Sequence, residues 1–245
     1  METTDAFFAA IKAGSVDKVT TFLRQEPWMA DAIHTTGAVD MNALVYSVEE
    51  KQPEITKLLV EAGAKIGVFE AAALGDARSV HRHLDQDRSL AEKRCRGGWS
   101  LLHLSVFSAS LALCADLTTY SGLLNAVSAN VYATTPLQLA IARSEVPCVS
   151  TLLAAGADPN VMDPASALAP PLHLATILGL SDAVRDLLHH QADVTMEYGV
   201  QMQGRISMHG PDGSVVGPAQ SRRAIDLAIQ QGHVEIIRML KDHRA

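Results

Sequence analysis

The side chains that could exchange protons with a substrate are scattered along the chain. The candidates are Glu70, Arg205, His209 and Asp226. Carboxylates and imidazoles act as general acids or bases when they lie within hydrogen-bond reach of a reacting group. The sequence contains no glycine-rich phosphate loop, no G-x-S-x-G and no HExxH motif. The catalytic residues are therefore unknown from sequence, and these four matter only if folding gathers them in one groove.

Metal ligands and cofactor motifs give no further site. His81 and His83 are two residues apart, so on a helix they point to different sides and do not share a metal ion with Cys95. Cys95, Cys114 and Cys148 show no CxxC spacing and are expected to be reduced thiols. We expect no metal and no cofactor.

A short apolar motif recurs and predicts the fold. The segment TPLQLA at residues 135–140 is repeated as PPLHLA at 170–175 and as SLLHLS at 100–105, a step of 35 residues. These segments resemble the T-P-L-H-x-A motif of the ankyrin-repeat family, whose period is about 33 residues. Residues 151–160, TLLAAGADPN, resemble the helix end and turn of the same family. The resemblance implies stacked helix-turn-helix repeats, in which His103 and His173 hydrogen-bond a neighbouring loop.

Local backbone chemistry supports this interpretation. Pro171 at the first helical position removes only an N–H group that has no partner inside the helix. Gly179 and Gly232 end the first helix of their repeats, because glycine adopts the left-handed conformation at little cost. Ser181 or Asp182 is then expected to cap the second helix.

The fold class predicted is all-α, an ankyrin-repeat solenoid of about seven helix-turn-helix repeats in one domain, residues 1–245. Its parts are a capping repeat at 1–38, internal repeats at 39–196, an insertion at 197–220 and a second capping repeat at 221–245. In the fourth repeat the expected glycine is missing between residues 108 and 130, where we expect two helices. The repeats are expected to begin near Asp5, Asn42, Phe69, Trp99, Thr134, Ala169 and Arg222.

The insertion at residues 197–220 has no helical period. Residues 205–209 alternate polar and apolar, residues 210–213 are a turn sequence, and residues 214–216 are apolar enough for a return strand. A β-hairpin is the favoured interpretation. A disordered surface loop is the alternative.

The family resemblance also places a binding surface. Partners of ankyrin repeats bind the finger loops and the exposed end of each first helix, which together line a concave face. The binding residues expected there are Trp99, Phe107, Tyr132, Arg143, Ile177 and Leu178. Aromatic and apolar residues in such a groove are typical of binding hot spots. The alternative is that Phe107, Ile177 and Leu178 pack inside the repeats.

Composition limits the class of partner. The net charge of −7 and the pI of about 5.8 disfavour general nucleic-acid binding. No apolar run is long enough to cross a membrane, and the acidic start Met1–Asp5 is no secretory signal, so we expect a cytoplasmic protein.

Three functions remain open, counting a protein that only scaffolds a larger assembly. The first is a module, monomeric or weakly oligomeric, that binds a protein partner through the concave surface. The alternative is an enzyme or small-molecule binder, with cyclase- or isomerase-like chemistry in an apolar groove capped by the insertion.

Overall fold

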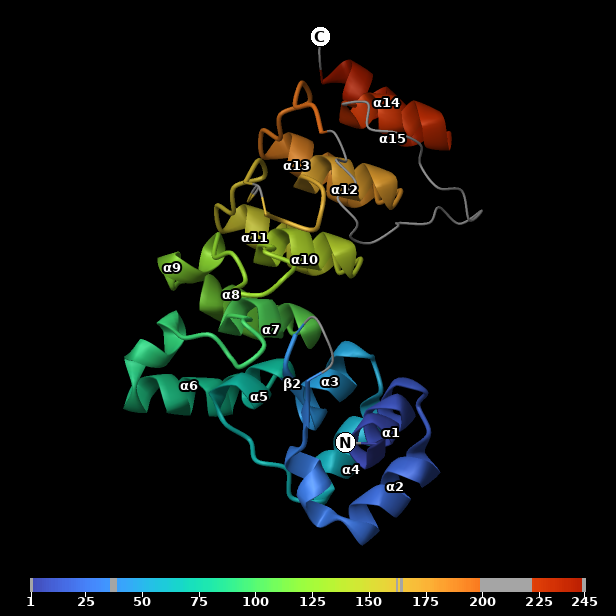
Figure 1. Cartoon of the computed structure of the whole chain (residues 1–245). Coiled ribbons are helices and arrows are strands. Elements are labelled where there is room, and N and C mark those ends of the chain that lie inside the picture. Colours follow the sequence, from blue (N-terminus) through green and yellow to red (C-terminus); the bar gives the residue numbers. More distant parts are fainter. Residues whose placement is uncertain (1, 36–38, 162, 164, 199–221, 244–245) are drawn as a thin grey trace. The chain divides into compact units, whose positions relative to one another are not determined.

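The computed structural model describes residues 2–35, 39–161, 163, 165–198 and 222–243. The chain is mostly helical, as predicted, and it divides into two compact units, Met1–Val131 (unit 1) and Tyr132–Ala245 (unit 2). Figure 1 shows the elements in chain order. In both units most helices pack in consecutive pairs, each made of a first and a second helix.

Unit 1 begins with four helix pairs whose first helices, α1, α3, α5 and α7, pack against one another in order. The pairs are α1 (Glu2–Lys12) with α2 (Val16–Gln25), α3 (Ala43–Glu49) with α4 (Pro53–Glu61), α5 (Val68–Ala73) with α6 (Ala77–Gln86), and α7 (Leu101–Phe107) with α8 (Leu111–Thr118). A short helix, α9 (Ser121–Leu124), follows, so the two helices expected between residues 108 and 130 are present.

The connections in unit 1 hold short regular elements that the sequence did not predict. The 3-10 helices η1 (Pro27–Asp31) and η2 (Arg88–Glu92) follow α2 and α6. The strands β1 (Ile33–His34) and β2 (Met41–Asn42) form a small antiparallel ladder between η1 and α3. Two-residue strands are too short to leave an alternating pattern in the sequence.

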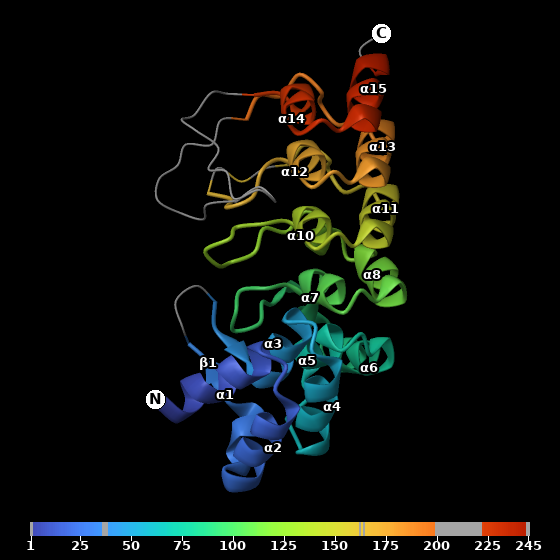
Figure 2. The ribbon, with the colours of Figure 1, turned by 90° about the vertical axis from the view of Figure 1, so that its right-hand side faces the viewer.

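Unit 2 contains three helix pairs. They are α10 (Pro136–Ala142) with α11 (Val146–Ala154), α12 (Pro171–Ile177) with α13 (Ser181–His189), and α14 (Ala224–Gln231) with α15 (Val234–Asp242). First helices stack on first helices and second helices on second helices, which Figure 2 shows as two columns. Leu172, Val184 and Leu187 are buried between them, so the apolar stripe of these helices forms the core of the unit.

Each pair turns at a residue in the left-handed conformation, directly where the first helix ends. Gly179 and Gly232 occupy this place, which confirms the helix ends predicted for them. In the fourth pair Ala109 takes the place with φ 51°, which is why the expected glycine is missing from the sequence. The full set is Gly14, Lys51, Gly75, Ala109, Ser144, Gly179 and Gly232.

One predicted helix cap is wrong. The second helix of the α12/α13 pair already begins at Ser181, so Leu180 is the N-cap residue and no side chain caps the helix. Only Leu180 separates the left-handed Gly179 from the start of α13, so Ser181 lies inside the first turn of the helix instead of before it.

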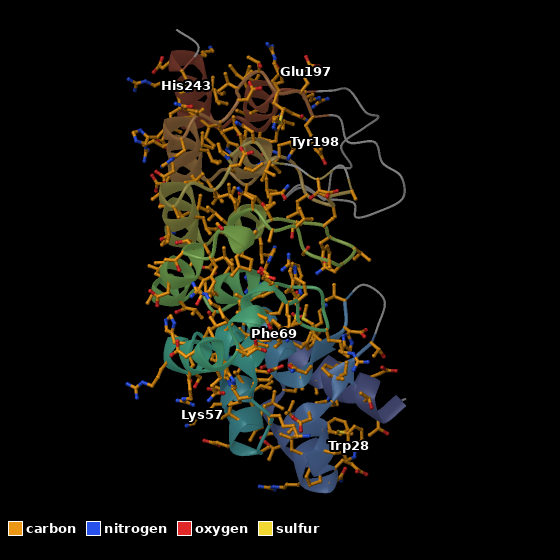
Figure 3. The ribbon with its side chains drawn as sticks, turned by 90° about the vertical axis from the view of Figure 1, so that its left-hand side faces the viewer. Trp28, Lys57, Phe69, Glu197, Tyr198 and His243 are labelled. Atoms are coloured by element: carbon orange, nitrogen blue, oxygen red, sulfur yellow. The ribbon has the colours of Figure 1, made fainter. Side chains whose placement is uncertain are left out.

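The predicted insertion lies almost entirely outside the described residues. The described residues on its two sides are joined, because Tyr198 and Arg222 exchange two backbone hydrogen bonds of 3.0 Å in an isolated antiparallel bridge. Figure 3 labels Tyr198 at this bridge. The β-hairpin and the surface loop both remain predictions.

Candidate binding surface

Three connecting loops of unit 1 approach one another closely, and glycine makes the approach possible. A Cβ atom on Gly98 would lie 2.3 Å from the carbonyl oxygen of Ala129, and one on Gly97 would lie 2.6 Å from that of Asp40. The backbone N–H of Ala129 donates to the carbonyl of Gly98 at 2.8 Å. The side chain of Asn130 donates to the carbonyl of Gly97 at 2.9 Å. The loops are therefore joined through their backbones.

Between these loops lies an open hollow of about 450 Å³, here called the finger-loop hollow. The guanidinium Nε of Arg96 lies 3.3 Å from a carboxylate oxygen of Asp40, and the Arg96 side chain is 66% exposed whereas that of Asp40 is 41% exposed. Val131 adds an apolar side chain that is 42% exposed. The lining residues are Val39, Asp40, Arg96, Gly97, Ala129, Asn130 and Val131.

The chemistry of the hollow suits recognition of polar and apolar groups together. An exposed ion pair such as Arg96–Asp40 contributes at most about 1 kcal/mol, so a partner can replace either member at low cost. The neighbouring Cys95 is held in the loop, where its backbone N–H donates to the carbonyl of Trp99 at 2.9 Å. Burial raises the pKa of the Cys95 thiol above its ordinary value, which keeps the thiol protonated and unreactive near neutral pH.

The ankyrin-repeat family model matches residues 132–164. This segment is an ankyrin repeat. It contains the TPLQLA motif and both helices of the α10/α11 pair, so the ankyrin resemblance predicted from the motif is confirmed for these residues. The comparison with curated proteins gives no match.

The ankyrin motif position works as predicted in unit 2. His173 is buried in α12, and its Nε2 lies 3.0 Å from the carbonyl oxygen of Arg222 in the following connection. Gln138 holds the same position in α10, and its side-chain amide donates to the carbonyl of Ala169 at 3.0 Å. Burial lowers the pKa of His173, so the neutral imidazole donates through Nε2–H.

Two of the predicted binding residues are core residues of unit 1. Trp99 is 2% exposed and Phe107 is 5% exposed. Their rings meet edge to face with centroids 5.2 Å apart. This packing agrees with the alternative that Phe107 lies inside the repeats. A direct role of these two aromatic residues in binding stays a prediction.

The other four predicted binding residues belong to unit 2. Arg143 and Leu178 occupy the same place in neighbouring pairs, directly before the left-handed residue. Leu178 is 39% exposed, whereas Tyr132, Arg143 and Ile177 are half-buried. Leu178 is therefore the most exposed of these residues. Their use in binding also stays a prediction.

The two described candidate acid–base groups, Glu70 and Asp226, each accept hydrogen bonds at the start of a helix in their own unit. The Glu70 carboxylate accepts from the backbone N–H of Gly67 at 2.9 Å and from the Asn42 side chain at 2.6 Å. The Asp226 carboxylate accepts from the backbone N–H of Arg223 at 3.0 Å. Both carboxylates thus cap the start of a first helix. Arg205 and His209 lie outside the described residues.

Sequence reasoning missed the residues that line the hollow. Asp40, Arg96, Asn130 and Val131 come from loops more than 30 residues apart in the sequence, and no periodic pattern links them. The Gly97-Gly98 pair was the available signal, because adjacent glycines indicate a place where another backbone approaches closely.

The structure offers no sign of a membrane span or a metal cluster within the parts it describes. No helix there combines the length and apolar composition that a bilayer requires. No group of three histidine, cysteine, aspartate or glutamate side chains in those parts converges as metal ligands would. His81 instead forms a 3.0 Å hydrogen bond with Asp116.

Proposed function

We propose that the chain is a non-catalytic module that binds a protein partner through its finger loops and the concave ends of its first helices. Ankyrin repeats are generally protein-interaction modules. The observation that carries the proposal here is the finger-loop hollow, with the exposed Arg96–Asp40 pair beside the apolar Val131. A charged pair next to an apolar side chain supports specificity and affinity at once.

The proposal includes the arrangement of the repeats. We propose that all seven helix pairs are repeats of one solenoid, with 1–38 and 221–245 as its capping repeats. Support comes from the left-handed residue between the two helices of each pair, which recurs from Gly14 to Gly232. A cytoplasmic location also belongs to the proposal, because all three cysteines are free thiols.

Peptides selected from a display library on the intact chain provide a direct test. Val131→Asp and Arg96→Glu should each weaken binding of the selected peptides about tenfold or more, equivalent to about 1.4 kcal/mol. Leu111→Asp is the matched control, because Leu111 is 45% exposed in the same unit but lies on the second helix α8. Circular dichroism establishes that every variant is folded.

Two outcomes would contradict this proposal. If the peptides bind Val131→Asp and Arg96→Glu as tightly as the original chain, the hollow is not the binding site. If Leu111→Asp weakens binding as much as they do, the effect is general. Glu70 and Asp226, which the enzyme alternative invokes, accept hydrogen bonds at the starts of α5 and α14.

A further inference from the structure

Neighbouring helix pairs are joined by a recurring side-chain bond between their second helices. In the three bonds given below, the first partner lies six residues after the left-handed residue of its own pair. This place is here called the rung position. The second partner is a carboxylate on the second helix of the next pair. The bonds are His81 Nε2 with Asp116 at 3.0 Å, Ser150 Oγ with Asp186, and Arg185 with Glu235 at 3.1 Å.

Neighbouring pairs also meet at the left-handed turn. A Cβ atom on Gly14, Gly75 or Gly179 would lie within 3.0 Å of a side-chain atom of the next pair. In each case the covering residue directly follows the left-handed residue of that next pair. The covering residues are Gln52, Ser110 and His233. At these three junctions the following pair therefore packs closely against the left-handed turn of the pair before it.

The α14/α15 pair presents the same features without a cover among the described residues. Ile229 is 57% exposed, whereas Ile141 and Thr176, at the equivalent place in the two preceding pairs, are fully buried. A Cβ atom on Gly232 would meet no described atom within 4 Å. Figure 2 shows α14 and α15 at the end of both columns of unit 2. This surface is here called the α14/α15 face.

The α14/α15 face also carries a cation at its rung position. Arg238 lies six residues after Gly232, as Arg185 lies six residues after Gly179. Its side chain is 84% exposed, and its ion pair with Asp242 in the same helix is long, 3.8 Å. The geometry of the preceding pair predicts that Arg238 is matched by a carboxylate three residues after the left-handed residue of whatever stacks here.

The α1/α2 pair of the same chain has this complement. Asp17 is exposed three residues after Gly14, the place that Glu235 holds after Gly232. Ser15 follows Gly14 and is the same residue type as Ser110, which covers Gly75. The free side of α1 is lined by small exposed residues, which let another helix approach closely. These are Ala6, Ala9 and Ala13.

We propose that a second copy of this chain docks its α1/α2 pair on the α14/α15 face, head to tail. Asp17 of the second copy then pairs with Arg238, and α1 covers Ile229. Such a contact joins two different surfaces, so each copy can both receive and donate one contact. A single helix-pair interface is small, so the association is weak and increases with protein concentration.

Sedimentation velocity over a wide concentration range tests the proposal with a charge swap. Arg238→Glu and Asp17→Arg should each lower the association constant about fivefold or more. The double variant Arg238→Glu with Asp17→Arg should restore most of the loss, because the pair is re-formed with reversed charges. Ile229→Lys should abolish association. The control Leu111→Lys should leave it unchanged, since Leu111 is 45% exposed on α8, which belongs to neither of the two proposed contact surfaces.

Three results would overturn the proposal. A chain that remains monomeric at all concentrations has no such contact. A loss caused by Arg238→Glu but not by Asp17→Arg means that the face binds something other than the α1/α2 pair. A double variant that is no better than the single variants excludes the Arg238–Asp17 pairing. Circular dichroism and melting of each variant separate these outcomes from unfolding.

Discussion

Replacing Ala109 by glycine should stabilise unit 1, although glycine normally destabilises a folded chain. Ala109 is exposed, follows helix α7, and has φ 51°. The same place is glycine in the neighbouring α5/α6 pair, where Gly75 has φ 74°. An L-residue in the left-handed region is strained because its Cβ crowds the following carbonyl oxygen.

The expected gain follows from two opposing effects. Removing the Cβ atom releases about 1–2 kcal/mol of strain at Ala109. Glycine costs about 0.5–1 kcal/mol in additional unfolded-state entropy relative to alanine. Little buried area is lost, since Ala109 is exposed. Ala109→Gly should therefore raise the free energy of unfolding by about 0.5–1 kcal/mol.

Urea unfolding followed by circular dichroism measures this change against a matched control. Ala115 is an exposed alanine in helix α8 of the same unit, where the backbone is helical. Ala115→Gly should lower the free energy of unfolding by about 0.5–1 kcal/mol, as glycine does inside helices. The two alanine-to-glycine changes thus have opposite signs. If both destabilise equally, the left-handed turn at Ala109 is not strained and the reasoning fails.

Three further changes test other parts of the structure. Leu172→Ala and Leu187→Ala should each destabilise unit 2 by about 2–5 kcal/mol in urea unfolding, because both side chains are buried. Burial lowers the pKa of His173 in the folded chain, so below about pH 6.5 the unfolded chain binds this proton more tightly and the free energy of unfolding falls. His173→Gln should therefore make the free energy of unfolding fall less steeply as the pH is lowered. Replacing residues 200–217 by a short Gly-Ser link should leave the helical signal and the melting temperature nearly unchanged, since the Tyr198–Arg222 bridge already joins the two ends of this segment.

Each of these has a result that contradicts it. If the leucine variants lower the free energy of unfolding by less than about 0.5 kcal/mol, the two side chains do not belong to the core. An unchanged pH slope in His173→Gln would mean that this imidazole titrates alike in the folded and unfolded chain; the glutamine keeps the amide donor seen at Gln138. A large drop in helical signal or melting temperature after the loop replacement would mean that the Tyr198–Arg222 bridge alone does not hold the ends of this segment together.

Backbone chemistry explains which parts of the fold could be read from the sequence. Pro171 and Gly179 each favour one local conformation almost regardless of their neighbours, so the helix start and end they mark are correct. Ala109 gives no such signal, because its left-handed turn is imposed by the packing of α7 and α8 rather than by its own preference. The sequence between residues 108 and 130 therefore does not mark where the first helix of the fourth pair ends.

The site was less predictable because burial and long-range approach decide it. Trp99 was predicted in an exposed finger loop, but it directly precedes Ser100, the N-cap of α7, and packs on Phe107. Every residue of α7 is buried, so its period cannot distinguish a concave face from a core face. The finger-loop hollow depends on backbone contacts between loops far apart in the chain, such as Gly98 with Ala129.

The candidate catalytic carboxylates show how a reactive residue type can have a structural use. Glu70 and Asp226 both lie three residues after the N-cap of a first helix, and so do Gln138 and His173. From that position a side chain can reach back to the N-cap N–H or across to the next connection. Glu70 and Asp226 accept from the N-cap N–H of their own helix. His173 bonds a carbonyl of the following connection, and Gln138 makes both kinds of bond. All four side chains thus satisfy backbone N–H or carbonyl groups at the start of a first helix, a structural role that carboxylate, imidazole and amide groups can all fill.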